Sequence, residues 1–141
     1  MAIFLLVAPA PAAPAAEPSP YPRRTLILFV AAWCAPCHAE IARIDEIMRV
    51  AQPYGVKVVP MDSGRRGEAM LRRVPTAVLW RPTPGQLLAI TTDLARRTTG
   101  LPFSIMTDDG AVLCASSKAG VDGHVVRAMQ AQCRPAAIIM Q

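Results

Sequence analysis

The chain has 141 residues, of which 52% are hydrophobic and 18% are charged, and its formal net charge is +5. This length fits one domain of ordinary size, and the apolar fraction can form a core, which excludes general disorder. No apolar run reaches the ~18 residues that a membrane-spanning helix needs. The basic residues are nearly all arginines, scattered as pairs without interleaved aromatic residues. This pattern favours a solvated basic surface over nucleic-acid binding.

Residues 1–22 combine an apolar stretch, Ala2–Ala8, with an Ala/Pro-rich tract. The small-x-small triplet Ala13-Pro14-Ala15 resembles the cleavage site of a secretory signal peptide. The stretch is short and no Lys or Arg precedes it, so a disordered leader on a cytoplasmic protein is the alternative. We predict a signal-like leader over 1–22, one domain over 23–141, and export to the periplasm or beyond.

The first half of the domain predicts a β-α-β unit. Thr25–Ala31 is a continuous apolar run, which predicts a strand buried on both faces. The segment Trp33–His38 follows it directly, and Ala39–Ala51 then predicts a helix that ends before Pro53. Apolar residues recur at helical spacing in this helix (Ile41, Ile44, Ile47 and Met48). Val56–Met61 predicts a second strand, parallel to the first through a right-handed crossover.

The middle of the chain gives weaker patterns. Gly67–Val74 predicts a short helix, and Ala77–Trp80 a strand that ends in the turn Pro82–Gly85. Gln86–Ile90 then predicts a further strand and Asp93–Arg97 a helix.

The end of the chain predicts a hairpin and a helix. Phe103–Thr107 and Ala111–Ser116 are β-prone runs joined by the turn Asp108–Gly110. Asp122 can cap a last helix, Asp122–Gln132.

This order of elements resembles the thioredoxin superfamily over about residues 25–133, most weakly over 63–98. The motif Trp33-Cys34-x-Pro36-Cys37-x-x-Glu40, with Gly100-Leu101-Pro102 much later, is similar to exported thioredoxin-like thiol–disulfide oxidoreductases. These include the reductases of cytochrome c maturation. The resemblance implies an α/β, thioredoxin-like fold with a central mixed β-sheet flanked by helices.

The two cysteines of this motif predict redox chemistry. At a strand-to-helix turn, unpaired N–H groups and the helix dipole favour a thiolate on the first cysteine. We therefore predict that Cys34 is the nucleophile and that Cys37, one turn later and more buried, resolves the mixed disulfide. Pro36 suits the first helical turn, and Trp33 would shield the pair. A passive structural disulfide is the alternative.

The same residues also spell Cys-x-x-Cys-His, the c-type haem attachment motif. In that alternative Cys34 and Cys37 form thioethers, and His38 and a methionine such as Met61 or Met106 ligate the iron. A strand that leads straight into the motif argues against haem. Three zinc ligands within one turn do not close easily on one metal, and a second Cys-x-x-Cys is missing. A redox-inert binding module with the same fold is a further alternative.

The resemblance also implies a role for Glu40. It matches an acidic position, three residues after the second cysteine, where the exported reductases keep a carboxylate under the active site that helps to move protons. Cytosolic thioredoxins have a buried acid six positions before the first cysteine, and this chain has Leu28 there. The alternative for Glu40 is a surface carboxylate paired with Arg43.

A cis-proline beside the active site is implied by the same resemblance, with its preceding backbone pairing with the substrate. Pro75 lies 38 residues after Cys37, and Pro102 lies 65 after it. One hairpin and one helix should come after the cis-proline, and the chain beyond Pro102 has this order. We predict that the Leu101–Pro102 peptide is cis and faces Cys34.

The other two cysteines stand alone in the sequence. Cys114 falls on the predicted last strand and Cys133 just after the last helix, so they could form a bridge in an oxidising compartment. In the alternative, Cys114 is a small buried hydrophobe and Cys133 a free thiol.

Together these patterns predict a thiol–disulfide oxidoreductase, most simply a reductant, because Ala35-Pro36 keeps a proline next to the second cysteine as in reducing members. Its expected partners are protein thiols or disulfides and an electron donor or acceptor that the sequence does not identify. We expect no cofactor, no metal, no nucleic acid and no stable membrane span.

Overall fold

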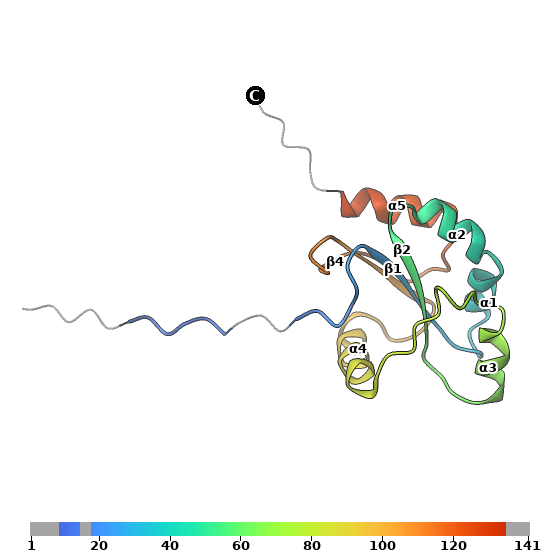
Figure 1. Ribbon diagram of the computed structural model, residues 1–141, viewed down its shortest axis with the longest axis horizontal. Helices are drawn as coiled ribbons and strands as arrows, with labels where there is room; N and C mark the ends of the chain where they lie inside the picture. The colour runs from blue at the N-terminus through green and yellow to red at the C-terminus, as the bar shows by residue number, and fades with distance from the viewer. Residues whose placement is uncertain (1–8, 15–17, 135–141) are drawn as a thin grey trace, which may run out of the picture.

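The computed structural model describes residues 9–14 and 18–134, so the predicted leader lies partly outside the described residues. Within these described residues, nine elements follow one another (Figure 1). They are β1 (Thr25–Val30), α1 (Ala35–Ala42), α2 (Ile44–Ala51), β2 (Gly55–Pro60), α3 (Arg65–Leu71), α4 (Pro84–Arg97), β3 (Phe103–Thr107), β4 (Leu113–Ser117) and α5 (Gly123–Cys133).

The strands form one mixed sheet in the order β2-β1-β3-β4. β1 pairs in parallel with β2 and antiparallel with β3, and β3 pairs antiparallel with β4. The crossover between the parallel strands β1 and β2 is made by α1 and α2. The predicted α/β class with a central mixed sheet flanked by helices is therefore confirmed.

The central strand β1 is buried over its whole length because both of its faces carry core. One face, which includes Leu26 and Leu28, packs in a cluster with α1, α2, α3 and α5. The opposite face, with Ile27 and Phe29, packs against residues of α4. Figure 1 shows α4 on one side of the sheet and α2 and α5 on the other. The alternation follows from the two-residue period of a strand.

The predicted single helix Ala39–Ala51 is divided in two at Arg43. Arg43 leaves helical geometry (φ −106°, ψ 14°), and its N–H donates to the carbonyl of Glu40 at 3.0 Å, a shorter-range bond than that of an α-helix. The cysteine motif therefore lies on a short helix of its own, α1.

In the middle of the chain, the predicted strand Gln86–Ile90 is wrong. These residues belong to α4, because Thr83 and Gln86 form a reciprocal capping box and Pro84 occupies the first turn. The predicted strand Ala77–Trp80 is reduced to a single bridge between Leu79 and β2. The short helix predicted over Gly67–Val74 is α3.

The hairpin and last helix form close to the predicted positions. β3 and β4 pair with a register shift between Met106 and Thr107. The Asp122 side chain accepts from the N–H of Val125 at 2.9 Å, which confirms it as the N-cap of α5.

Upstream of β1, Tyr21 is part of the packed unit. Its ring is buried and meets Phe29 edge-on, and its hydroxyl donates to Asp93 of α4 at 2.7 Å. Within the described part of the chain, every helix is too short or too polar to cross a membrane.

Candidate active site

Cys34 and Cys37 form a disulfide at the start of α1, with 5.3 Å between their Cα atoms. Cys34 is the N-cap, and its sulfur accepts from the N–H of Cys37 at 3.3 Å. The buried strand β1 delivers the chain to this point, and Pro36 occupies the first helical turn. Cys34 is 3% exposed and Cys37 is fully buried, so Cys34 is the more accessible of the two cysteines.

Trp33 lies immediately before the pair and is 69% exposed. A large apolar side chain in solvent beside the disulfide is available for contact with another molecule. Pro36 is exposed as well, and it lies beside the loop at Gly120. A Cβ atom added to Gly120 would be 3.6 Å from the Cβ atom of Pro36. Two exposed apolar side chains, Trp33 and Pro36, therefore flank Cys34.

Glu40 is buried beneath this surface, with 1% exposure, so the alternative of a surface pair with Arg43 is wrong. One carboxylate oxygen, Oε1, accepts from the N–H of Val121 at 2.8 Å, and Oε2 has no hydrogen-bond partner. Burial raises the pKa of Glu40 to about 7, although the hydrogen bond from Val121 acts in the opposite direction. Glu40 lies three residues after Cys37, and both side chains are buried on α1.

The turn before Cys34 is held by two side chains that the sequence pattern did not assign to the site. The N–H of Ala32 donates to Asp62 Oδ2 at 2.9 Å, and His38 Nε2 donates to the carbonyl of Ala32 at 2.8 Å. A carbonyl can only accept, which fixes the proton on Nε2. Asp62 follows β2, and the cysteine motif follows β1. Because the carboxyl ends of parallel strands meet at one edge of a sheet, this position in the sequence could have identified Asp62 as a neighbour of the motif.

The Leu101–Pro102 peptide is cis, as predicted, and Val74–Pro75 is not. Pro102 directly precedes β3, whose first residue, Phe103, pairs with Phe29 near the end of β1. Because the cysteine motif begins at that same end of β1, Pro102 is brought to the edge of the sheet that carries the disulfide. That it faces Cys34 stays a prediction.

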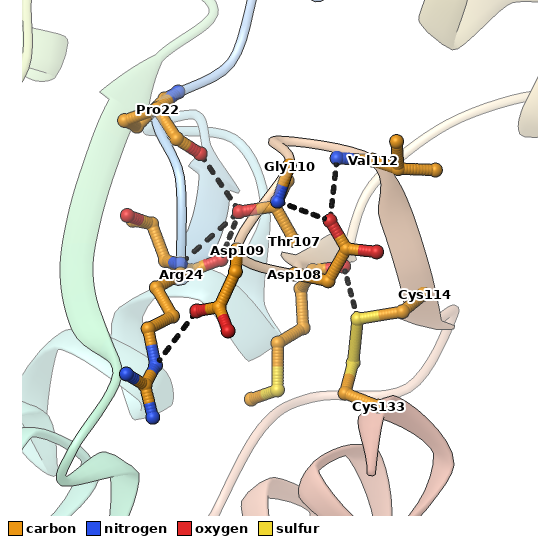
Figure 2. Close-up of a disulfide and its surroundings, with 11 residues drawn as sticks. Pro22, Arg24, Thr107, Asp108, Asp109, Gly110, Val112, Cys114 and Cys133 are labelled. Atoms are coloured by element: carbon orange, nitrogen blue, oxygen red, sulfur yellow. Dashed lines mark hydrogen bonds and ion pairs between the residues drawn. A yellow bond between two sulfur atoms is a disulfide. The ribbon is translucent and has the colours of Figure 1, made fainter. Parts of the chain in front are cut away.

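The second cysteine pair, Cys114 and Cys133, is also joined, with 4.9 Å between Cα atoms (Figure 2). The bridge connects β4 to the last residue of α5. Cys114 Sγ lies 3.3 Å from the carbonyl oxygen of Met106 on the neighbouring strand. The nearby turn is closed by Asp108, whose Oδ1 accepts from the N–H groups of Gly110 and Val112 (Figure 2).

The haem alternative would use His38 as an iron ligand. In the structure Nε2 of His38 is engaged with Ala32, and the motif joins a sheet strand to a short helix. In the described part of the chain, no three His, Cys, Asp or Glu side chains gather as metal ligands would.

No family model matches the chain, and no curated protein matches it. Solved structures do match. A thioredoxin-family thiol:disulfide interchange protein from Chlorobium tepidum TLS is 15% identical, with 79% of this chain and 81% of that chain covered and a TM-score of 0.60. A thioredoxin-related protein from Neisseria meningitidis serogroup B is 16% identical, with 86% and 91% covered and a TM-score of 0.56.

A third similar structure is a putative thiol:disulfide interchange protein DsbE from Chlorobium tepidum. It is 20% identical, with 78% of this chain and 77% of that chain covered and a TM-score of 0.52. Since the likeness covers 78% to 86% of this chain, the chain has the thioredoxin-like fold.

Proposed function

We propose that the protein is an exported thiol–disulfide oxidoreductase that reduces disulfides in other proteins. The observation that carries the proposal is the Cys34–Cys37 pair at the N-terminus of α1, with the sulfur of Cys34 accepting a backbone N–H. The same N–H stabilises a thiolate on Cys34 when the bond is open, because charge-assisted hydrogen bonds and the helix dipole both favour the anion.

The reaction proceeds in two exchange steps. The Cys34 thiolate attacks one sulfur of the substrate disulfide, which forms a Cys34–substrate bond and releases the other substrate sulfur as a thiolate. Cys37 then loses its proton and attacks Cys34, which closes the Cys34–Cys37 bond and releases the second substrate thiolate. Two electrons pass to the substrate, and an external electron donor must reopen the bond.

Glu40 is the proton acceptor for Cys37 in this scheme. Its pKa of about 7 lets both protonation states exist at neutral pH, and its free oxygen Oε2 has no competing hydrogen bond. A buried thiol needs a nearby base to ionise, because burial penalises the charged sulfur. Trp33 and the backbone before Pro102 supply the substrate contact, Trp33 through its exposed ring.

Two features support export. The leader pattern over 1–22 suits a secretory signal peptide. The Cys114–Cys133 bridge suits an oxidising compartment, since bridges of this kind are rare where thiols are kept reduced.

Single cysteine variants test the mechanism. Cys34→Ser should abolish the reduction of insulin disulfides, because the nucleophile is gone. Cys37→Ser should instead accumulate a mixed disulfide between Cys34 and the substrate, visible by mass spectrometry and cleaved by dithiothreitol. Equal residual activity in the two variants would contradict the assignment of roles.

A further inference from the structure

A groove of about 330 Å³ lies beside the active-site turn, between that turn and α3. Its lining residues come from both sides: Ala32, His38, Arg66, Ala69, Met70 and Arg73. Figure 1 shows α1 and α3 as neighbours at one end of the sheet. The volume is at the lower end of the ~300–1,000 Å³ that ligand sites occupy.

The α3 side of the groove has an apolar middle and cationic ends. Arg66, Ala69 and Met70 stand at positions i, i+3 and i+4 of α3, which lie on one face of a helix, and Arg73 follows in the turn after α3 ends. Met70 is 3% exposed and forms the floor, whereas both arginines are exposed. Arg66 therefore flanks the apolar middle from within α3, and Arg73 flanks it from the turn that follows.

The charge of these arginines is not neutralised within the described part of the chain. Neither Arg66 nor Arg73 makes an ion pair there. The acid between them in sequence, Glu68, is bound at both oxygens by Arg81 at 3.0 and 3.1 Å. Asp62, the other nearby acid, accepts from the N–H of Ala32 with Oδ2, and its Oδ1 is buried without a hydrogen-bond partner. In the part of the chain that the structure describes, the groove therefore presents two exposed cations that no carboxylate pairs with.

The opposite wall of the groove is rigid and close to the reactive bond. Both polar backbone groups of Ala32 are engaged, its N–H by Asp62 and its carbonyl by His38. Ala32 is two residues before Cys34, so whatever occupies the groove lies next to the disulfide that exchanges. Because this wall is already held in place, a partner can bind to it without first ordering it, which lowers the entropic cost of binding.

We propose that this groove docks an acidic segment of the protein that exchanges disulfides with Cys34. The segment carries two carboxylates on either side of two small apolar side chains, which fit between Arg66 and Arg73 over Met70. Arginine binds carboxylates through paired hydrogen bonds and steers an acidic partner towards the site. The inference rests on the proposed function.

The test compares two disulfide-linked peptides that differ only in charge. In one, two aspartates separated by two alanines adjoin the cysteine; in the other, asparagines replace the aspartates. The reduced protein should reduce the acidic peptide about tenfold faster at low ionic strength. The preference should disappear in ~1 M salt, where the screening length falls to ~3 Å. The double variant Arg66→Glu/Arg73→Glu should lose or invert it.

Two controls separate the possible failures. Arg49→Glu/Arg127→Glu makes the same change of net charge at exposed positions on α2 and α5 and should keep the preference. If it alters the preference as strongly as the groove variant, the effect is one of net charge and the docking site is wrong. An unchanged preference in Arg66→Glu/Arg73→Glu also overturns the proposal. The neutral bis(2-hydroxyethyl) disulfide reports the chemistry of Cys34 alone, and failure of the native protein to reduce it would contradict the proposed function instead.

Discussion

The two disulfides of this protein lie at opposite ends of helices. Cys34 and Cys37 lie at the N-terminus of α1, where the N–H of Cys37 donates to the sulfur of Cys34. Cys133 is the last residue of α5, where free carbonyls gather, and its partner Cys114 lies 3.3 Å from the carbonyl of Met106. One pair therefore meets positive partial charges and the other meets negative ones.

The loops that the two bonds close differ as well. Cys34 and Cys37 are separated by 3 residues in sequence, and Cys114 and Cys133 by 19. Closing the longer loop removes more conformational entropy from the unfolded chain, so only the second bond contributes strongly to stability in the chain-entropy model. The same covalent bond is thus suited to exchange at one site and to cross-linking at the other.

The largest expected difference between the two disulfides is the rate at which each is reduced in the native protein. Exposure alone favours attack on the second pair, because Cys133 is 8% exposed and Cys34 only 3%. The local charges favour the first pair. With limiting dithiothreitol followed by alkylation and peptide mapping, we expect Cys34 and Cys37 to be labelled about 100-fold faster than Cys114 and Cys133. Labelling of both pairs at one rate would refute the electrostatic distinction.

Removal of the second bond should affect stability and leave exchange intact. Cys114→Ala/Cys133→Ala should lower the free energy of unfolding by about 3 kcal/mol, measured by urea denaturation of the oxidised protein. Insulin reduction at 25 °C should remain within about twofold of the native rate, because neither residue touches the Cys34 site. A variant of native stability, or one as inactive as Cys34→Ser, would contradict the division of roles.

The next prediction concerns Glu40, beside the first disulfide, and the pH dependence of the free energy of unfolding. Its pKa is raised to about 7 in the folded chain, so the folded state holds the proton more tightly than the unfolded state does. The stability that comes from the neutral carboxyl is complete below pH ~4.5 and is lost as the pH rises through ~7. Between pH 5 and pH 8 the native protein should lose about 2 kcal/mol relative to Glu40→Gln.

Urea denaturation of both proteins across this range measures the difference, and the variant cancels the contributions of the two histidines. A pH-independent difference would mean that Glu40 is ionised throughout. In the insulin assay, the same variant should slow the second exchange step, seen as a build-up of mixed disulfide on Cys34.

The smallest expected effect concerns the support of the active-site turn. Asp62→Ala leaves the N–H of Ala32 without its acceptor and should cost about 1 kcal/mol. Glu68→Ala breaks only an exposed ion pair with Arg81 and should cost less than about 0.5 kcal/mol. Equal losses in thermal unfolding would show that Asp62 contributes no more than a surface charge.

The parts of the fold that depend on local chemistry are predictable from the sequence. The apolar run of β1, the cysteine motif and the cap at Asp122 each depend on neighbours in sequence. The error at α4 is also local: Thr83 and Gln86 spell a capping box, yet Pro82–Gly85 is equally typical of a turn before a strand.

Other features depend on packing that no local pattern records. Glu40 is buried because the loop at Val121 covers it, and Asp62 reaches Ala32 only because β1 and β2 are parallel neighbours. The Cys114–Cys133 bridge depends on how α5 crosses the sheet, so the sequence alone leaves it open beside a free-thiol alternative.

The buried side-chain amide of Gln130 affects how the molecule responds to force, because it connects two helices. The two hydrogens of Gln130 Nε2 are shared among the carbonyls of Val50, Ala51 and Gln52, at 3.0, 2.9 and 3.3 Å. This clamp fastens α5 to the end of α2, while Cys133 fastens α5 to the sheet. If a force pulls on a substrate bound to Cys34, we expect α2, α5 and β4 to move together as one rigid unit. The chain would bend first at Arg43, where α1 and α2 meet.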